Sequence, residues 1–445
     1  MQRTGLIGKL ARTASGSGTF LILLLLMLVF SVLTIRTQSS TGTDAGYSSA
    51  REASQSLPKS ATVVIIATAS PEDREFTVGA AAGLTEQGFA PVGIVNGGPP
   101  DARRLLDRLA AENQFPSVLI ASGASSLWTV FERYEQFHPE MLIVPREELW
   151  PDFLKLSNLL GVASQTAIYA IIAVGMTMVI ISREIDLSVG SVLALASVTT
   201  TVCLRDYCGG INASVPAVLF ALGIGLAVAT AAGAINGLML TVFRLPSFIV
   251  TLGMMLMARG AAQLISQQQS IGSSDIPPIF RAAGGSGLLG VPNPVWLMIG
   301  LYAAAHFLMS RTLFGRVLYA IGGNPEAAEL CGIRIARMRL LVFSISGFLA
   351  GLGGLLLSAR LNAGDPKYGE MYELEVIAAV VVGGTSLLGG EGRMLGTLAG
   401  AFIIAIIRNG MNLLGVESAS QNIVLGAVLL TAVLIDQAKR RWQQH

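Results

Sequence analysis

The segment SQTAIYAIIAVGMTMVIIS (164–182) contains no charged side chain and no proline. The hydrocarbon core of a bilayer is about 30 Å thick, and a helix needs roughly 20 mostly apolar residues to cross it. Residues 164–182 meet that requirement, so we predict a transmembrane helix there. The fold follows from how often this kind of segment recurs along the chain.

Nine other stretches have the same character, one near the N-terminus and eight after residue 182. They are 19–35, 188–204, 214–243, 247–266, 294–310, 339–358, 373–389, 395–416 and 420–436. Two pairs are joined by loops so short that re-entrant geometry is an alternative to complete crossings. The predicted fold class is a polytopic α-helical membrane protein of about ten transmembrane helices.

The composition agrees with a chain that is dissolved mainly in lipid. Of its 445 residues, 52% are hydrophobic and 13% are charged, against roughly 25% charged residues in soluble domains. The net charge is +2, and Lys and Arg form no cluster on one face. Such a chain is not expected to bind nucleic acid, because that requires several phosphates to be neutralised together.

Residues 36–157 differ from the rest because they hold most of the Asp, Glu and Pro. Runs rich in β-branched residues at 61–69, 91–98 and 117–122 alternate with segments of helical spacing at 75–88 and 101–113. This order predicts a small α/β domain with parallel strands. It would be inserted between the first transmembrane helix, within residues 1–35, and a membrane domain at 158–437 followed by a tail at 438–445.

The first apolar stretch and the loop charges set the predicted orientation. Arg3, Lys9 and Arg12 precede residues 19–35 as in a signal peptide, but no Ala-x-Ala site follows closely, so we predict an uncleaved anchor. Cytoplasmic loops carry an excess of Lys and Arg. A cytoplasmic N-terminus places most loop arginines inside, and ten crossings then place both termini in the cytoplasm and residues 36–157 outside.

Several kinds of chemistry are missing from the sequence. No GxxxxGK[ST] loop is present, so ATP would have to be hydrolysed by another protein. The histidines His138, His306 and His445 are too scattered for a metal site or a catalytic triad, and we predict no enzyme activity and no bound metal. The acidic residues of the membrane part fall at the ends of the predicted spans, which argues against a proton-driven carrier; they are Asp186, Glu373, Glu375 and Asp436.

The segment TLFGRVLYAIGGNPEAAELCGIRIARMRLL (312–341) includes the predicted cytoplasmic loop 311–338. Asn324 and Pro325 are typical of a helix start, and Glu326 lies in the first turn, where the helix dipole favours a carboxylate. Gly332 is placed to end the helix. A short rigid helix of this kind is what a soluble motor protein needs to grip.

These motifs resemble the permease subunits of ABC importers for ribose, xylose, arabinose and galactosides. The similar segments occur in the family order over nearly all of residues 158–437; they are GMTMVIISREIDLSVGS, GAINGLML, LPSFIVTLGMMLMARG, GVPNPVW, GRVLYAIGGNPEAA, YELEVIAAVVVGGTSLLGGEGRMLGTLAGA and RNGMNLLGV. The EAA-x-x-x-G element is similar to the family's coupling helix. The resemblance implies that Glu326, Ala327, Ala328 and Gly332 dock an ATP-binding subunit.

The resemblance also implies the partners and the location. Two copies of the chain would form the pore in a bacterial inner membrane, surrounded by lipid, and two ATP-binding subunits would bind the ATP. A periplasmic solute-binding protein would deliver a monosaccharide or a similar small polar solute. No cofactor is expected in this chain.

Three features depart from the family pattern. Arg183 and Glu184 stand where two glycines usually precede IDLSVG, which puts the geometry of that turn in doubt. Arg408 lies inside a predicted span, where it would face the pore or the protein interior, or extend to the interface. The domain at 36–157 resembles one lobe of a sugar-binding protein, and it could dock the binding protein, act as a partial receptor, or be a neutral insertion.

Polar residues within the spans are candidates for a sugar path, because a sugar is held by hydrogen bonds. They are Gln165, Thr177, Asn236, Thr251, His306, Arg408, Asn409 and Asn412. Each could equally join two helices. Cys203 and Cys208 both face outward in the predicted topology and could form a disulfide or remain unpaired.

Two other functions compete with the importer. One is a membrane sensor whose external domain binds a ligand, but it would require a cytoplasmic output domain. The other is an ion-coupled carrier, which would transport its solute without ATP.

Overall fold

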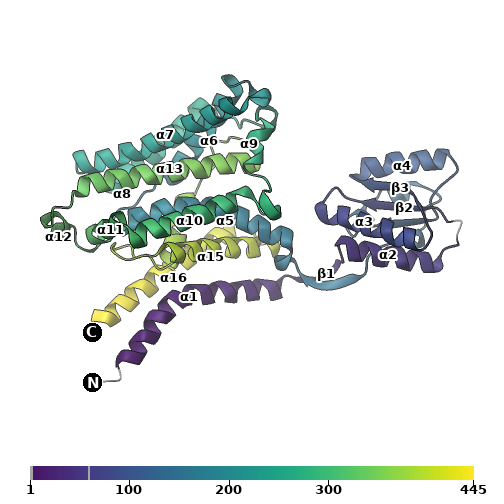
Figure 1. The fold of residues 1–445 in the computed structure, drawn as a ribbon, viewed down its shortest axis with the longest axis horizontal. Helices are drawn as coiled ribbons and strands as arrows, with labels where there is room; N and C mark the ends of the chain where they lie inside the picture. Colours follow the sequence, from purple (N-terminus) through teal and green to yellow (C-terminus); the bar gives the residue numbers. More distant parts are fainter. Residues whose placement is uncertain (1–3, 59–60, 445) are drawn as a thin grey trace. The chain divides into compact units, whose positions relative to one another are not determined.

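The computed structural model describes residues 4–58 and 61–444. They divide into two compact units, shown in Figure 1. The helical unit comprises the N-terminal helix up to Thr34 and the chain from Phe153 onward, and the α/β unit comprises Ile35–Asp152. Each unit is described by itself.

Within the described residues, the helical unit contains eleven helices of 11 or more residues, together with short connecting helices. The helices are α1 (Thr4–Leu33), α5 (Leu156–Ile181), α6 (Val189–Asp206), α7 (Val215–Val242), α8 (Ser247–Ile265), α9 (Pro278–Ala282), α10 (Asn293–Arg311), α11 (Leu313–Gly323), α12 (Pro325–Leu330), α13 (Ile335–Leu361), α14 (Tyr372–Val382), α15 (Met394–Leu413) and α16 (Ser418–Gln444).

Helix α5 lies at the centre of this unit. Its neighbours are α10, α13, α14 and α15, and α13 also packs along α6 and α7 (Figure 1). Almost every side chain of α5 from Thr166 to Ile181 is buried. An all-round apolar helix of this kind has to be surrounded by other helices, which explains why the segment 164–182 carries so few polar side chains.

Six helices in the described part of the chain are long and apolar enough to cross a bilayer: α5, α6, α7, α8, α13 and α15. Helices α10 and α11 meet the same test together but are bent by 68° at their junction. The apolar parts of α1 and α16, at 18–33 and 418–434, are somewhat shorter. A multi-pass helical membrane protein is thereby confirmed.

The prediction of a full-length helix over 373–389 is wrong. Helix α14 has 11 residues, which span only about 16 Å at 1.5 Å per residue. After Val382 the chain continues without regular structure, and the backbone N–H of Gly390 donates to the carbonyl of Ile181 at 2.9 Å. The non-helical chain is thereby bonded to the last residue of α5.

The α/β unit contains a four-stranded parallel sheet in the order β3-β2-β4-β5. Its strands are β2 (Val63–Ala67), β3 (Pro91–Asn96), β4 (Val118–Ala121) and β5 (Leu142–Ile143). Helices α2 (Gly42–Ser56) and α3 (Pro71–Glu86) cover one face, and α4 (Pro99–Ala111) covers the other (Figure 1). The predicted alternation of strands and helices and the parallel pairing are confirmed, whereas α2 was not predicted.

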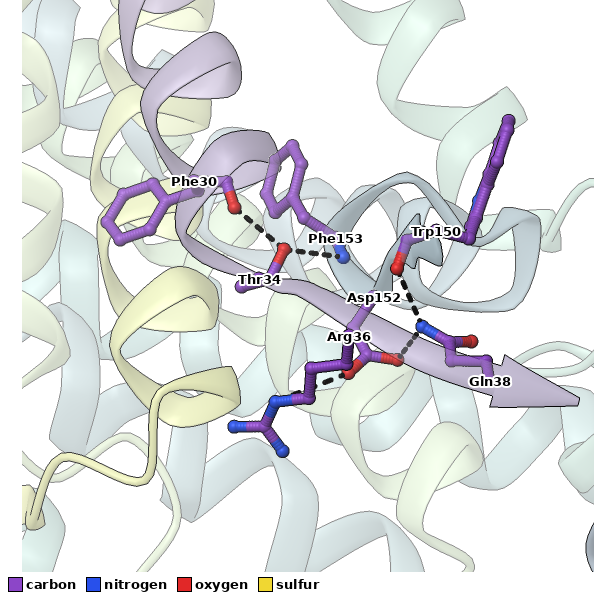
Figure 2. A network of polar contacts seen from close by, with 7 residues as sticks. All are labelled: Phe30, Thr34, Arg36, Gln38, Trp150, Asp152 and Phe153. Atoms are coloured by element: carbon purple, nitrogen blue, oxygen red, sulfur yellow. Dashed lines mark hydrogen bonds and ion pairs between the residues drawn. The ribbon is translucent and has the colours of Figure 1, made fainter. Parts of the chain in front are cut away.

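A two-stranded antiparallel ribbon begins and ends the α/β unit. It pairs β1 (Ile35–Ser39) with β6 (Glu147–Pro151), and Ile35 lies opposite Pro151. Figure 2 shows Gln38 donating to the carbonyl of Trp150 and to the carboxylate of Asp152, each at 2.9 Å. The chain therefore enters and leaves this unit at neighbouring positions.

Within the helical unit, the end of α1 is bonded to Phe153, just after the ribbon. The Thr34 hydroxyl donates to the carbonyl of Phe30 at 2.7 Å and accepts from the Phe153 backbone N–H at 3.1 Å (Figure 2). The rings of Phe30 and Phe153 stack with their centroids 6.3 Å apart. These contacts fix the end of α1 beside the residues that lead into α5.

Candidate functional site

The helix predicted between 324 and 332 is present as α12. Asn324 is its N-cap, and the Asn324 side-chain oxygen accepts from the Ala327 backbone N–H at 3.0 Å. Pro325 takes the first helical position, where a missing N–H removes no hydrogen bond. Glu326 lies in the first turn, as its favourable interaction with the helix dipole predicts.

Gly332 ends α12 in the predicted way. Its φ is +80°, in the left-handed region that glycine adopts without steric cost. The N–H of Gly332 donates to the Glu329 carbonyl at 2.9 Å, and the N–H of Ile333 donates to the Ala328 carbonyl at 3.1 Å. This pair of bonds is the Schellman motif, which satisfies the last carbonyls of a helix.

The two sides of α12 differ in exposure. Ala328 is 4% exposed and packs against the protein, whereas Glu326 and Ala327 are exposed and Leu330 is 90% exposed. An apolar side chain left this open, on a short helix fixed at both ends, is suited to bind a protein partner. Helix α11, which precedes α12, contacts the central helix α5, so α12 is connected to the core of the unit.

Three of the predicted path residues are completely buried and hydrogen-bonded inside the protein. The hydroxyls of Thr177 and Thr397 lie 2.8 Å apart, joining α5 to α15. Asn236 donates to the Ser188 hydroxyl at 2.9 Å, and Thr251 donates to the Ser247 carbonyl one turn earlier. In this conformation Thr177 joins two helices and Asn236 bonds to the N-cap residue of α6, whereas the Thr251 bond lies within α8. All three side chains are buried and none lines an open passage.

The other uncharged candidates lie at different places. Asn409 and Asn158 exchange two hydrogen bonds of 2.8 and 3.1 Å, and Asn412 accepts from Gln421 at 2.6 Å. The Gln165 side-chain nitrogen lies 3.5 Å from the Tyr169 hydroxyl, a long hydrogen bond, and Gln165 lines a small cavity together with Arg408. His306 is exposed on α10. The structure therefore does not gather the predicted residues into one site.

Arg408 forms an ion pair that the sequence analysis missed. Its guanidinium lies 2.5 Å from the carboxylate of Glu375 on α14, and the two side chains are 26% and 7% exposed. Beside the pair is a cavity of about 100 Å³, lined by Leu374, Ile404, Asn422 and Leu425 among others. A position facing the protein interior was among the predicted alternatives for Arg408, but no carboxylate partner was named for it.

Asp186 and Glu375 lie at helix ends, as the sequence predicts, but both side chains are buried. Glu375 is buried as described, and Asp186 is 1% exposed. Asp186 accepts from the Ser188 backbone N–H and hydroxyl at 3.0 and 2.6 Å and from the Ser346 hydroxyl at 2.9 Å. These bonds compensate for burial of its charge. The DLS sequence, with a hydroxyl two residues after the carboxylate, could have indicated this local cap; the side chain of Asp436 lies outside the described residues.

Cys203 and Cys208 lie close together at the end of α6. Their sulfur atoms are 3.8 Å apart, and both thiols are free in the structure. A disulfide between them stays a prediction. Among the described residues, no group of three or more His, Cys, Asp or Glu side chains is arranged to hold a metal ion.

Comparison with known proteins identifies what this arrangement is similar to. Residues 158–433 match the family described as "Branched-chain amino acid transport system / permease component". Ribose import permease protein RbsC of Escherichia coli (strain K12) is 42% identical, over 67% of this chain and 92% of that protein. The RbsC protein of Bacillus subtilis (strain 168) is 41% identical, over 67% and 90%. Xylose transport system permease protein XylH of Escherichia coli (strain K12) is 37% identical, over 65% and 87%. No solved structure matches the chain.

Proposed function

This chain belongs to the permease family described as the branched-chain amino acid transport system permease component, and on that basis we propose that it is the membrane-spanning subunit of an ABC importer for a small sugar. It is a transport protein and not an enzyme. ATP is hydrolysed by a separate subunit, which would bind at the cytoplasmic side. A periplasmic solute-binding protein would release the sugar at the other side.

The observation that carries this proposal is the geometry of α12. It is a short helix capped at both ends, and Glu326, Ala327 and Leu330 are exposed. A motor protein can transmit force only through a rigid contact, and both caps remove the fraying that would absorb a movement. We assign Glu326, Ala327 and Gly332 to docking of the ATP-binding subunit, and Ala328 to anchoring α12 on the permease.

The proposed solute is a pentose or a similar monosaccharide. The relatives described above are named as ribose and xylose permeases. The membrane part offers uncharged hydrogen-bonding side chains such as Thr177, Asn236 and Asn409, which suit hydroxyl groups. Since these are paired within the protein in this conformation, they would be released for the solute only when the helices move.

The proposed topology retains ten passes with one change. The segment from Tyr372 to Gly389 would cross as the short helix α14 followed by non-helical chain. Both termini would be cytoplasmic in a bacterial inner membrane, and the α/β unit would be periplasmic. A second copy of the chain would complete the pore, with lipid around the pair.

Reconstitution tests the proposal. The permease is placed in proteoliposomes with its ATP-binding subunit, and ATP hydrolysis is measured with binding protein loaded with ribose or xylose. We expect the ATP-binding subunit to co-purify with the permease and loaded binding protein to stimulate hydrolysis. Failure to co-purify, or hydrolysis that does not respond to loaded binding protein, would refute the proposed function.

A further inference from the structure

Arg183 and Glu184 follow the last residues of α5 on the side of the helical unit where α12 lies. We propose that these two residues clamp the coupling segment, defined as residues 324–334, at both of its ends and connect it mechanically to α5. The inference rests on the proposed function, since it says how a movement of α12 reaches the core of the permease.

The backbone at Arg183 has the geometry of a helix C-terminus that normally uses glycine. Its φ is +66°, in the left-handed region. The N–H of Arg183 donates to the Ile180 carbonyl at 3.0 Å, and the N–H of Glu184 donates to the Val179 carbonyl at 3.1 Å. This is a Schellman motif with arginine at the position that favours glycine. The two residues therefore keep a turn that glycine would form with less strain.

The Arg183 side chain provides what glycine would lack. Its Nε donates to the Leu388 carbonyl at 2.8 Å, and its Nη2 donates to the Gly323 carbonyl at 3.0 Å. Gly323 is the last residue of α11 and comes directly before Asn324, the N-cap of α12. Arg183 thus holds the chain where the coupling segment begins.

Glu184 holds the other end. Its carboxylate lies 2.7 Å from the guanidinium of Arg339, in the early part of α13. Glu184 is 9% exposed and Arg339 is 27% exposed, so the pair is largely shielded from water. Partial burial strengthens the attraction between the two charges relative to an exposed pair. Helix α13 begins directly after the coupling segment, so the two clamp contacts bracket that segment.

Close packing supports the clamp. A Cβ on Gly322 would lie 1.8 Å from the Ile181 carbonyl oxygen and 2.4 Å from the Gly390 nitrogen. The ends of α5 and α11 and the turn at 389–390 are therefore in direct contact. In addition, the Tyr319 hydroxyl of α11 donates to the Gly392 carbonyl at 2.8 Å. A displacement of α12 would be transmitted to α5 and to the chain after α14 together.

A non-glycine residue in the left-handed region costs stability. Glycine at position 183 would avoid this cost. What arginine adds there is its two side-chain hydrogen bonds, to Leu388 and to Gly323. Replacement by glycine should leave the fold intact or more stable while weakening the clamp. This combination separates a mechanical role from a purely structural one.

The test compares Arg183→Gly with Arg244→Gly in reconstituted full-length permease with its ATP-binding subunit and ribose-loaded binding protein. Arg244 is the matched control because it also has a left-handed φ, of +54°, and its exposed side chain makes no bond among the residues that the structure describes. The readouts are the thermal midpoint and the number of sugar molecules imported per ATP hydrolysed.

We expect neither variant to lower the thermal midpoint, and only Arg183→Gly to lower import per ATP, by roughly fivefold, because both side-chain hydrogen bonds of Arg183 are lost. Glu184→Gln should lower it as well, because the ion pair to Arg339 is lost. Equal import per ATP in Arg183→Gly and Arg244→Gly would overturn the clamp. If the wild type itself showed no ATP-dependent import, the proposed function would have failed instead.

A second measurement follows the clamp without transport. A nitroxide attached to Cys331, which is exposed at the end of α12, reports local mobility once Cys203 and Cys208 are changed to Ser. Arg183→Gly should raise the mobility of the label, and Arg244→Gly should not. An unchanged spectrum in Arg183→Gly would also overturn the clamp.

Discussion

Replacement of Gly332 by Ala should weaken binding of the ATP-binding subunit without affecting insertion of the permease. Gly332 has a φ of +80°, and no atom lies within 4 Å of the position that its Cβ would take. The added methyl group therefore collides with nothing beyond the residue and its two chain neighbours. The whole effect comes from holding an L-amino acid in the left-handed conformation.

That conformation costs an L-residue roughly 1–2 kcal/mol. Alanine also restricts the unfolded chain, which offsets about 0.4–1 kcal/mol of global stability. We expect the Schellman motif after α12 to loosen by about 1 kcal/mol locally. If docking requires the motif, the same free energy is lost from binding, and 1.4 kcal/mol corresponds to a factor of about ten in the dissociation constant. The expected loss is therefore roughly fivefold.

The assay is the dissociation constant of the purified ATP-binding subunit for permease in nanodiscs. Gly323→Ala is the control, because Gly323 is also exposed, is nine residues earlier, lacks a left-handed φ, and has no atom within 4 Å of its Cβ position. Gly323→Ala should bind as the wild type does. Equal affinities for the two variants would refute the assignment of the α12 terminus to docking.

Three further predictions follow from the structure. Arg408→Ala should lower the free energy of unfolding by about 3 kcal/mol, because Glu375 would remain buried without its partner. The double variant, with Arg408 changed to Met and Glu375 to Leu, should lose less stability on thermal unfolding in detergent. A larger loss in the double variant than in Arg408→Ala would contradict this reading of the ion pair. Thr177→Val should cost about 0.6 kcal/mol, the average for an interhelical hydrogen bond in a membrane, and should also lower uptake, because the hydroxyl proposed to meet the solute is lost; unchanged uptake in this variant would make Thr177 a contact between helices only. Residues 41–145 can be replaced by Asn-Gly, which suits a two-residue hairpin and should retain the ribbon of β1 and β6. The membrane part should then still bind the ATP-binding subunit, and loss of that binding would show that the membrane part needs the α/β unit to fold.

Local sequence rules were sufficient for some elements. Asn324, Pro325 and Gly332 determine a helix start and end through short-range geometry, and the structure has both caps where the sequence predicts them. The strands β2 and β4 were found because buried parallel strands are short runs of β-branched residues between turns. The edge strand β3, in which only Val95 is buried, carries the same kind of run.

Other features depend on contacts far apart in the sequence. Helix α14 ends at Val382 although the apolar run continues, because hydropathy alone does not distinguish a helix from buried non-helical chain. The ribbon of β1 with β6 joins residues more than 100 positions apart and has no periodic signal. The Arg408–Glu375 pair was missed for the same reason, since each charge was considered on its own span.

Arg183 illustrates a different limit. Its departure from a family glycine was visible in the sequence, and it raised doubt about the turn. The structure shows the turn retained at a φ of +66°, with the side chain bonded to two other segments. A strained backbone position occupied by a large side chain marks a contact that only the folded chain reveals.

The most direct test of the central claim is uptake of radiolabelled ribose or xylose into proteoliposomes that contain the permease and its ATP-binding subunit. Loaded binding protein is on the side of the α/β unit, and ATP is on the side of α12. We expect uptake that requires ATP, binding protein and permease together. Uptake that continues without ATP under an ion gradient would contradict the account and indicate an ion-coupled carrier.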